Sequence, residues 1–203
     1  MNNFTVRNTS SRITKAFFSL VILCVSLQLS AQDASPTEKV EATVSAILVI
    51  LRDDALNLEE KRDQMREKIS AAFDARAMSQ SVLSTNWRQA SEAQQQEFQA
   101  LFMQTLEDTY MGRLEAYTNE SVDFRGEEIK NNRSQVDTVI VTANNEIPIN
   151  YKLRLRSDGW FVYDVEVENV SMVSSYRETY RSVVRRDGMD GLLEQMRERA
   201  TSG

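Results

Sequence analysis

The chain has 203 residues, a formal net charge of −6 and no histidine. Without an imidazole it has no Ser-His-Asp or Cys-His catalytic arrangement and no typical zinc or copper site. We therefore expect no bound metal or cofactor and no enzymatic activity of those kinds. The net negative charge of the chain also makes nucleic acid, which is itself negatively charged, a poor candidate partner.

Residues 1–31 are typical of an export signal. Arg7, Arg12 and Lys15 precede an apolar run, Ala16–Leu27, that is too short to span a bilayer as a helix. We expect cleavage after the small residue Ala31. Cleavage removes three positive charges and no negative ones, so the net charge moves from −6 to −9.

The only cysteine of the chain, Cys24, lies within this segment. A lipoprotein signal acylated at Cys24 is the alternative interpretation, although Leu23 stands where a lipobox has a small residue. Residues 32–203 are long enough for one domain with a real core. We expect them to be soluble, to contain no disulfide and to be stabilised by packing alone.

Apolar residues recur at helical spacing through the first half of this domain. We predict helices over 36–52, 58–70, 75–83 and 92–117. The last begins with a capping-box pattern, Ser91–Gln94, and would be on the order of 40 Å long. That length exceeds what a domain of this size needs to close a core.

After residue 120 the spacing of apolar residues changes from 3.6 residues, typical of a helix, to 2 residues, typical of a strand. In the last predicted strand Phe161, Tyr163, Val165 and Val167 are expected to share one face. The predicted strands are 121–125, 136–143, 147–156 and 160–167, and the final helices are 174–186 and 190–199. This order predicts an α+β domain, a four-stranded antiparallel sheet wrapped by about six helices. Such an arrangement leaves an apolar cleft between sheet and helices.

Two groups of charged residues allow a functional and a structural interpretation. Asp164, with Glu166 nearby, could act as a general acid or base, but it alternates with Val165, so a structural hydrogen bond is favoured. Arg177 and Arg181 could contact a phosphate or an acidic partner. They could equally complement the helix dipole and pair with nearby glutamates.

Two blocks of sequence resemble the MlaC family, also called the toluene-tolerance auxiliary transport family. The first includes Trp87–Ala90 and Gln96–Tyr117, and the second includes Glu146–Tyr151 and Asp187–Leu192. The resemblance runs from about residue 41 to residue 199. Asn169 departs from the pattern, which has glycine before Val-Ser.

The resemblance implies a non-enzymatic periplasmic carrier that shuttles phospholipid between the outer and inner membranes and maintains outer-membrane lipid asymmetry. Its implied partners are an outer-membrane lipoprotein complex and an inner-membrane ABC transporter with an MCE-domain protein. The alternative is a periplasmic assembly or scaffold factor with a solid core. In the carrier hypothesis Arg177 and Arg181 contact the headgroup or a partner. The predicted lipid-binding residues are Met78, Val82, Phe98, Leu101, Phe102, Leu106, Tyr110, Val139, Val141, Ile149, Tyr151, Leu153, Phe161, Tyr163, Val165, Val167, Val170 and Met172.

Overall fold

The computed structural model describes residues 34–116 and 120–202, so the predicted export signal lies outside the described residues. The chain divides into two units, Met1–Gln32 and Asp33–Gly203, and the fold below is that of the second. Within the described ranges, no helix combines the length and apolar character needed to cross a bilayer.

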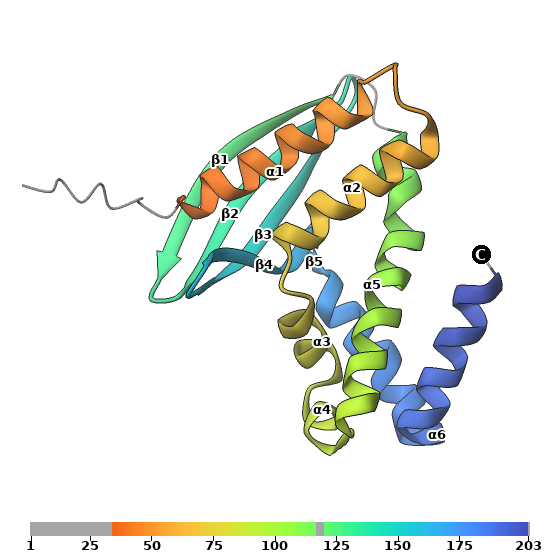
Figure 1. Ribbon diagram of the computed structural model, residues 1–203. Coiled ribbons are helices and arrows are strands. Elements are labelled where there is room, and N and C mark those ends of the chain that lie inside the picture. The colour runs from red at the N-terminus through yellow and green to blue at the C-terminus, as the bar shows by residue number, and fades with distance from the viewer. Residues whose placement is uncertain (1–33, 117–119, 203) are drawn as a thin grey trace, which may run out of the picture. The chain divides into compact units, whose positions relative to one another are not determined.

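The second unit contains six helices and five strands in its described residues (Figure 1). This is the α+β order that the sequence predicts. In chain order the elements are α1 (Pro36–Leu51), α2 (Leu58–Ala72), α3 (Ala75–Leu83), α4 (Thr85–Gln89), α5 (Glu92–Glu115), β1 (Ser121–Lys130), β2 (Arg133–Val141), β3 (Glu146–Arg156), β4 (Gly159–Val167), β5 (Val170–Ser171) and α6 (Met172–Ser202).

Three helices begin with the same local device. Ser35, Asn57 and Ser91 each accept a hydrogen bond from the main-chain N–H three residues later, and the side-chain oxygen at that later position accepts one from the main-chain N–H of the capping residue. These capping boxes satisfy the free N–H groups at the starts of α1, α2 and α5. At the other end of the chain, α6 breaks at Gly188, which has φ 73° and ψ −177°. The two predicted C-terminal helices are the two halves of α6.

The sheet is an antiparallel meander in the order β1-β2-β3-β4-β5. β1 and β2 are longer than predicted because Asn131, at φ 57°, allows a tight turn between paired Lys130 and Arg133. The turn from β4 to β5 is formed by Glu168 and Asn169, at φ 50° and 64°. Asparagine tolerates this left-handed region better than most residues, so Asn169 replaces the glycine of the family pattern without losing the turn.

The register of β4 on β3 slips by one residue at Tyr163. Such a β-bulge restarts the alternation of side chains along a strand. Val162, Val165 and Val167 consequently share the face that lines the interior. The prediction that Phe161 shares a face with Val165 is therefore wrong.

The buried apolar residues form three clusters instead of one continuous core. The helical cluster lies among α3, α4, α5 as far as Leu106, and α6, and Tyr110 packs against it. The sheet cluster joins α1 to the inner face of β2, β3 and β4, and the tip cluster joins α1, α2 and the end of α5. Figure 1 shows α1 lying along the sheet with α2 beside it, and α3, α4, α6 and the first half of α5 grouped beyond the end of the sheet. A domain usually has one contiguous core, so this division indicates that something separates the clusters.

Candidate functional site

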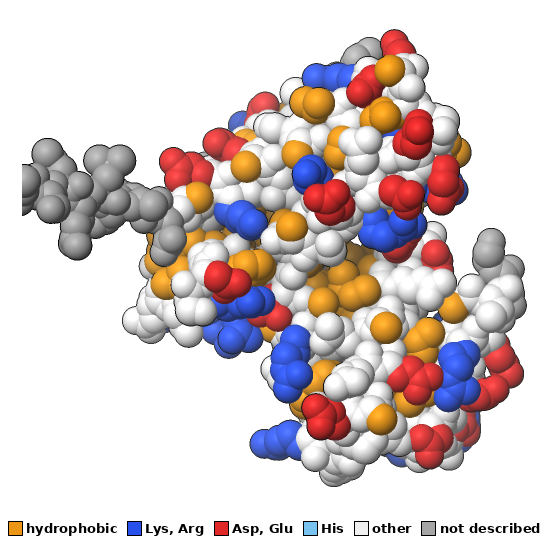
Figure 2. All heavy atoms as spheres, viewed as in Figure 1, with side chains coloured by type: hydrophobic (Ala, Val, Ile, Leu, Met, Phe, Trp, Pro, Cys, Tyr) orange, Lys and Arg blue, Asp and Glu red, His pale blue; other side chains and the backbone are white. Residues whose placement is uncertain are grey.

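A cavity of about 840 Å³ separates the three clusters. It is bounded by α1 and α2, by the inner face of β1 to β4, and by the second half of α5. Figure 2 shows hydrophobic side chains at the bottom of a hollow that opens between α2 and the helices α3 and α5, with charged side chains on its rim. The predicted cleft between sheet and helices is therefore present as a cavity.

The lining is mostly apolar and comes from every layer of the domain. The sheet contributes one inward residue from β1 and one from β2, and more from β3 and β4. These sheet residues are Val122, Ile140, Ile149, Tyr151, Val162, Val165 and Val167. Helix α5 covers the opposite side with Met103, Leu106, Tyr110, Met111 and Leu114.

The cavity opens to solvent, so it holds either water or a ligand. Water there would find few hydrogen-bond partners along a mostly apolar lining, which favours an apolar ligand.

The cavity opens beside α2 and α5 (Figure 2), and two ion pairs join these helices. The Arg66–Glu107 pair lines the cavity, whereas the Arg62–Glu115 pair lies outside the lining. The Nε of Arg66 donates to both carboxylate oxygens of Glu107, at 2.9 and 2.8 Å. One turn away, the Nε of Arg62 lies 2.5 Å from Glu115. The hydrogen bond from Arg62 lowers the pKa of Glu115 below its usual value, so this pair stays ionised near neutral pH.

Two tyrosines bring hydroxyl groups to the cavity wall. Burial raises the pKa of Tyr151 to about 12, because a phenolate there would lose its hydration. Burial, with Tyr176 nearby, also raises the pKa of Tyr110. Both phenols therefore stay neutral at physiological pH, so the tyrosines add no negative charge to the apolar interior.

Seven of the predicted lipid-binding residues line this cavity. They come from the second half of α5, from β3, from β4 after the bulge, and from the start of α6. These seven are Leu106, Tyr110, Ile149, Tyr151, Val165, Val167 and Met172.

Five predicted residues lie instead in the closed helical cluster: Met78, Val82, Phe98, Leu101 and Phe102. Phe98 and Phe102 stack with ring centroids 5.7 Å apart. Tyr180 meets the first ring edge-on at 5.8 Å and Tyr176 meets the second at 5.3 Å. The role of the α5 stripe thus changes along the helix. Phe98 and Phe102 are enclosed by the helical cluster, whereas Leu106 and Tyr110 contact the cluster and also line the cavity.

The remaining six predicted residues also lie outside the cavity lining, for reasons of strand geometry. On β2 the even-numbered residues point inward, so Val139 and Val141 lie on the opposite face from Ile140. Leu153 faces inward but is fully buried in the sheet cluster. The three others are Phe161 and Tyr163, displaced by the bulge, and Val170, which is 60% exposed.

The sequence prediction missed the contribution of α1 and α2 to the cavity wall. Five α1 residues and one α2 residue that line it are apolar: Val40, Val44, Ile47, Leu48, Leu51 and Ile69. The run from Ala46 to Leu51 is apolar on all sides of the helix. A helix of that kind has more apolar surface than one packed face requires, which is the signal that could have found it.

The charged residues singled out in the sequence have structural roles or lie on the surface. The Nε of Arg177 donates to the main-chain oxygen of Ser81 at 2.7 Å, and neither Arg177 nor the exposed Arg181 lines the cavity. Buried Asp164 accepts hydrogen bonds from Ser171 Oγ at 2.7 Å and from the main-chain N–H of Val173 at 3.1 Å. It holds the start of α6, which confirms the structural interpretation of this carboxylate.

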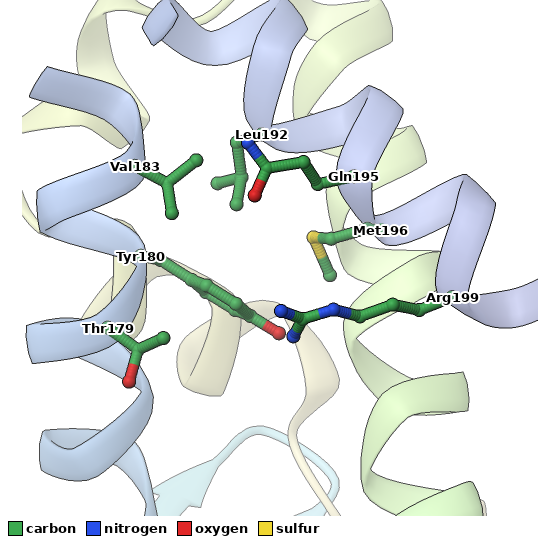
Figure 3. Close-up of a pocket in the computed structure, with 7 residues that line it drawn as sticks. All are labelled: Thr179, Tyr180, Val183, Leu192, Gln195, Met196 and Arg199. Atoms are coloured by element: carbon green, nitrogen blue, oxygen red, sulfur yellow. The ribbon is translucent and has the colours of Figure 1, made fainter. Parts of the chain in front are cut away.

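A second, much smaller pocket lies between the two halves of α6 (Figure 3). Its volume of about 20 Å³ admits about one water molecule. The hydroxyl of Tyr180 points across it toward the guanidinium of Arg199. It is a packing gap beside the Gly188 break and is too small for a lipid or a cofactor. Among the described residues, no group of three potential ligands could hold a metal ion.

Comparison with known proteins gives a consistent result. The MlaC protein family matches residues 41–198. The chain is 26% identical over 126 residues to the intermembrane phospholipid transport system binding protein MlaC of Haemophilus influenzae, a match that covers 59% of each chain. It is 23% identical over 178 residues to toluene tolerance protein ttg2D of Pseudomonas putida, covering 84% of this chain and 83% of that one.

A solved structure has the same fold. The phospholipid-binding protein of Ralstonia solanacearum, crystallised in complex with a phospholipid, superposes with a TM-score of 0.77 at 23% identity. The superposition covers 83% of this chain and 98% of the Ralstonia chain. Since the family match extends over most of the sequence, this chain belongs to the MlaC family.

Proposed function

We propose that this protein is a periplasmic phospholipid carrier of an intermembrane transport system, and that the cavity holds the acyl chains. The observation that carries the proposal is the apolar cavity of about 840 Å³, which divides the core into three clusters. The MlaC family is a family of non-enzymatic lipid carriers, and the related Haemophilus protein is named for intermembrane phospholipid transport.

The volume of the cavity, about 840 Å³, lies near the upper end of the range of about 300–1,000 Å³ for ligand pockets, so it is large enough for acyl chains. Each buried methylene contributes about 0.8 kcal/mol, so an acyl chain of about 14 methylenes contributes roughly 11 kcal/mol before ordering costs. Burial alone is therefore enough to hold the lipid without a covalent bond.

Purification of the protein from cells followed by native mass spectrometry tests the proposal. We expect the wild type to carry phospholipid masses. Val44→Trp, which fills space at the cavity wall, should reduce this occupancy, whereas Val49→Trp on the same helix should leave it unchanged because Val49 is 70% exposed and outside the lining. Circular dichroism of both variants checks that they fold.

Wild-type protein that carries no phospholipid after gentle purification would favour the scaffold alternative. A charge at Leu106 or Val165 should also lower occupancy. Both residues belong to buried clusters, however, so a charge at either position also lowers the stability of the folded protein. A substitution at Val44 separates the loss of lipid from the loss of stability better, because Val44 is only half-buried and contributes less to the core.

The location and partners form part of the same proposal. The expected partners are an outer-membrane lipoprotein complex and an inner-membrane ABC transporter with an MCE-domain protein, and the expected process is maintenance of outer-membrane lipid asymmetry. N-terminal sequencing of protein isolated from the periplasm tests the location. A mature terminus at Gln32 supports cleavage after Ala31, whereas an acylated terminus at Cys24 supports the lipoprotein alternative.

A further inference from the structure

We propose that the mouth of the cavity selects zwitterionic phospholipids over anionic ones, with Arg66 binding the phosphate and Glu107 binding the ammonium group. This inference rests on the proposed function and specifies its substrate class. It concerns a different part of the cavity from the acyl-chain wall.

The charged groups of the cavity lining are gathered at one place. The described lining contains one cation, Arg66 on α2, and two anions, Glu107 and Asp108 on α5. Polar Ser70 and Gln104 lie on the same two helices. A lipid whose tails fill the apolar interior would therefore place its polar end against this part of α2 and α5.

Arg66 has the chemistry and the access to bind a phosphate. Its guanidinium forms a planar fork that fits a phosphate with two parallel hydrogen bonds. In this structure the fork is engaged by the carboxylate of Glu107 across the mouth and by Asp63 on its own helix. The Arg66 side chain is 46% exposed, so an arriving headgroup can reach it.

The acidic neighbours decide which headgroup suits the mouth. Arg66 provides one positive charge, while Asp63, Glu107 and Asp108 provide three negative ones. When a phosphate takes the place of Glu107 on Arg66, that carboxylate loses its partner. An ethanolamine or choline headgroup brings an ammonium group that replaces the lost pair, so no ion pair is lost overall. A glycerol headgroup brings no cation, so Glu107 is left without a hydrogen-bonded cation and keeps only the weaker attraction of Arg62, one turn away on α2.

Lipid uptake from mixed vesicles tests this selectivity. The protein is incubated with vesicles of equimolar phosphatidylethanolamine, phosphatidylcholine and phosphatidylglycerol that share the same acyl chains, and the bound lipids are measured by mass spectrometry. We expect each zwitterionic lipid to exceed phosphatidylglycerol by about fivefold, the effect of one partly exposed ion pair. Glu107→Gln should reduce this ratio toward one.

Arg66→Gln should lower the uptake of phospholipids relative to diacylglycerol, which has the same tails and no phosphate. The matched control is Arg62→Gln, since the Arg62–Glu115 pair also joins α2 to α5 but neither residue lines the cavity. This variant should keep both the ratio and the uptake of the wild type. Equal changes in the two arginine variants would mean that the ion pairs act only by holding the helices together, and would overturn the inference.

Two further outcomes would also overturn it. Wild-type uptake in proportion to vesicle composition would remove the selectivity while leaving the carrier function intact, whereas no uptake of any lipid would remove the proposed function itself. Inorganic phosphate is titrated separately by calorimetry. Saturable binding of phosphate alone that is lost in Arg66→Gln would identify a free-anion site in place of a headgroup site.

Discussion

The Nε of Arg177 on α6 donates a hydrogen bond to the main-chain oxygen of Ser81, 2.7 Å away near the end of α3. The last carbonyl groups of a helix have no partner within the helix, and a cation there is also favoured by the helix dipole. Arg177 therefore fastens α3 to α6 at a point outside the cavity lining. This hydrogen bond gives Arg177 a structural role that requires no contact with lipid.

Arg177→Ala should lower the free energy of unfolding by about 2 kcal/mol, because a part-buried hydrogen bond from a charged group is lost. Arg181→Ala should change it by less than about 0.5 kcal/mol, since Arg181 is exposed. Urea denaturation measures both. Phospholipid occupancy of the folded protein should be unchanged in each. A stable Arg177→Ala variant without lipid would return this residue to the headgroup role that the sequence allowed.

The division of α5 between a closed core and a cavity could not be predicted from its sequence. Phe98, Phe102, Leu106 and Tyr110 recur at one helical spacing, and periodicity shows only that they share a side of the helix. Whether that side meets another helix or an open space depends on where α3 and α6 end. The unusual length of the predicted helix was the useful signal, because α5 spans both regions.

Phe98→Ala and Tyr110→Ala should separate these two regions. Phe98 is fully buried among aromatic rings, so its truncation should cost about 3–5 kcal/mol of stability and leave lipid occupancy of the folded protein unchanged. Tyr110 is only half-buried at the cavity wall, so its truncation should cost less stability and alter lipid retention. Denaturation and native mass spectrometry of each variant provide the measurements. Equal loss of lipid in both would mean that the closed cluster opens in solution.

The four main strands followed from alternation and the antiparallel sheet from the order of the elements, but the inward faces of two strands could not be predicted. In β2 the run Val139–Val141 has three β-branched residues in succession, so it fits either face. Only the buried Ser134, Val136 and Thr138 indicate which face points inward. In β4 a single bulged residue, Tyr163, reverses the alternation, and no composition signal marks it.

Two glycines in helical segments should respond to alanine in opposite ways. Gly188 has φ 73° and ψ −177°, a conformation that is strained for any residue with a Cβ atom, so Gly188→Ala should destabilise the fold by about 1–3 kcal/mol. Gly112 lies exposed within α5 with open space at its Cβ position, so Gly112→Ala should stabilise by about 1 kcal/mol. Urea denaturation compares them. A neutral Gly188→Ala would mean that the two halves of α6 can join into one straight helix.

The two tyrosines whose pKa is raised to about 12, Tyr151 and Tyr180, should make stability fall at alkaline pH. An unfolded tyrosine loses its proton near pH 10, whereas these folded ones keep theirs until about pH 12. The unfolded state therefore binds fewer protons in this window, so stability is full below pH 10 and is lost as the pH rises toward 12. Tyr151→Phe and Tyr180→Phe should each reduce this loss in denaturation curves recorded between the two values.

Removal of bound lipid should distinguish the two tyrosines in a titration followed by absorbance near 295 nm. Tyr151 lies at the cavity wall, where burial by the protein alone already raises its pKa to about 12, so bound lipid beside it should raise the pKa further and delipidation should reverse that increase. Tyr180 lies in the closed helical cluster, so removal of lipid should not change the exposure of its phenol to water. In the wild type and in Tyr180→Phe, one phenol should thus ionise at a lower pH after delipidation than with lipid bound. Tyr151→Phe should show no such change. Unchanged titration of Tyr151 would mean that lipid does not reach the β3 side of the cavity, and the volume available to acyl chains would then be limited to the space between α1, α2 and α5.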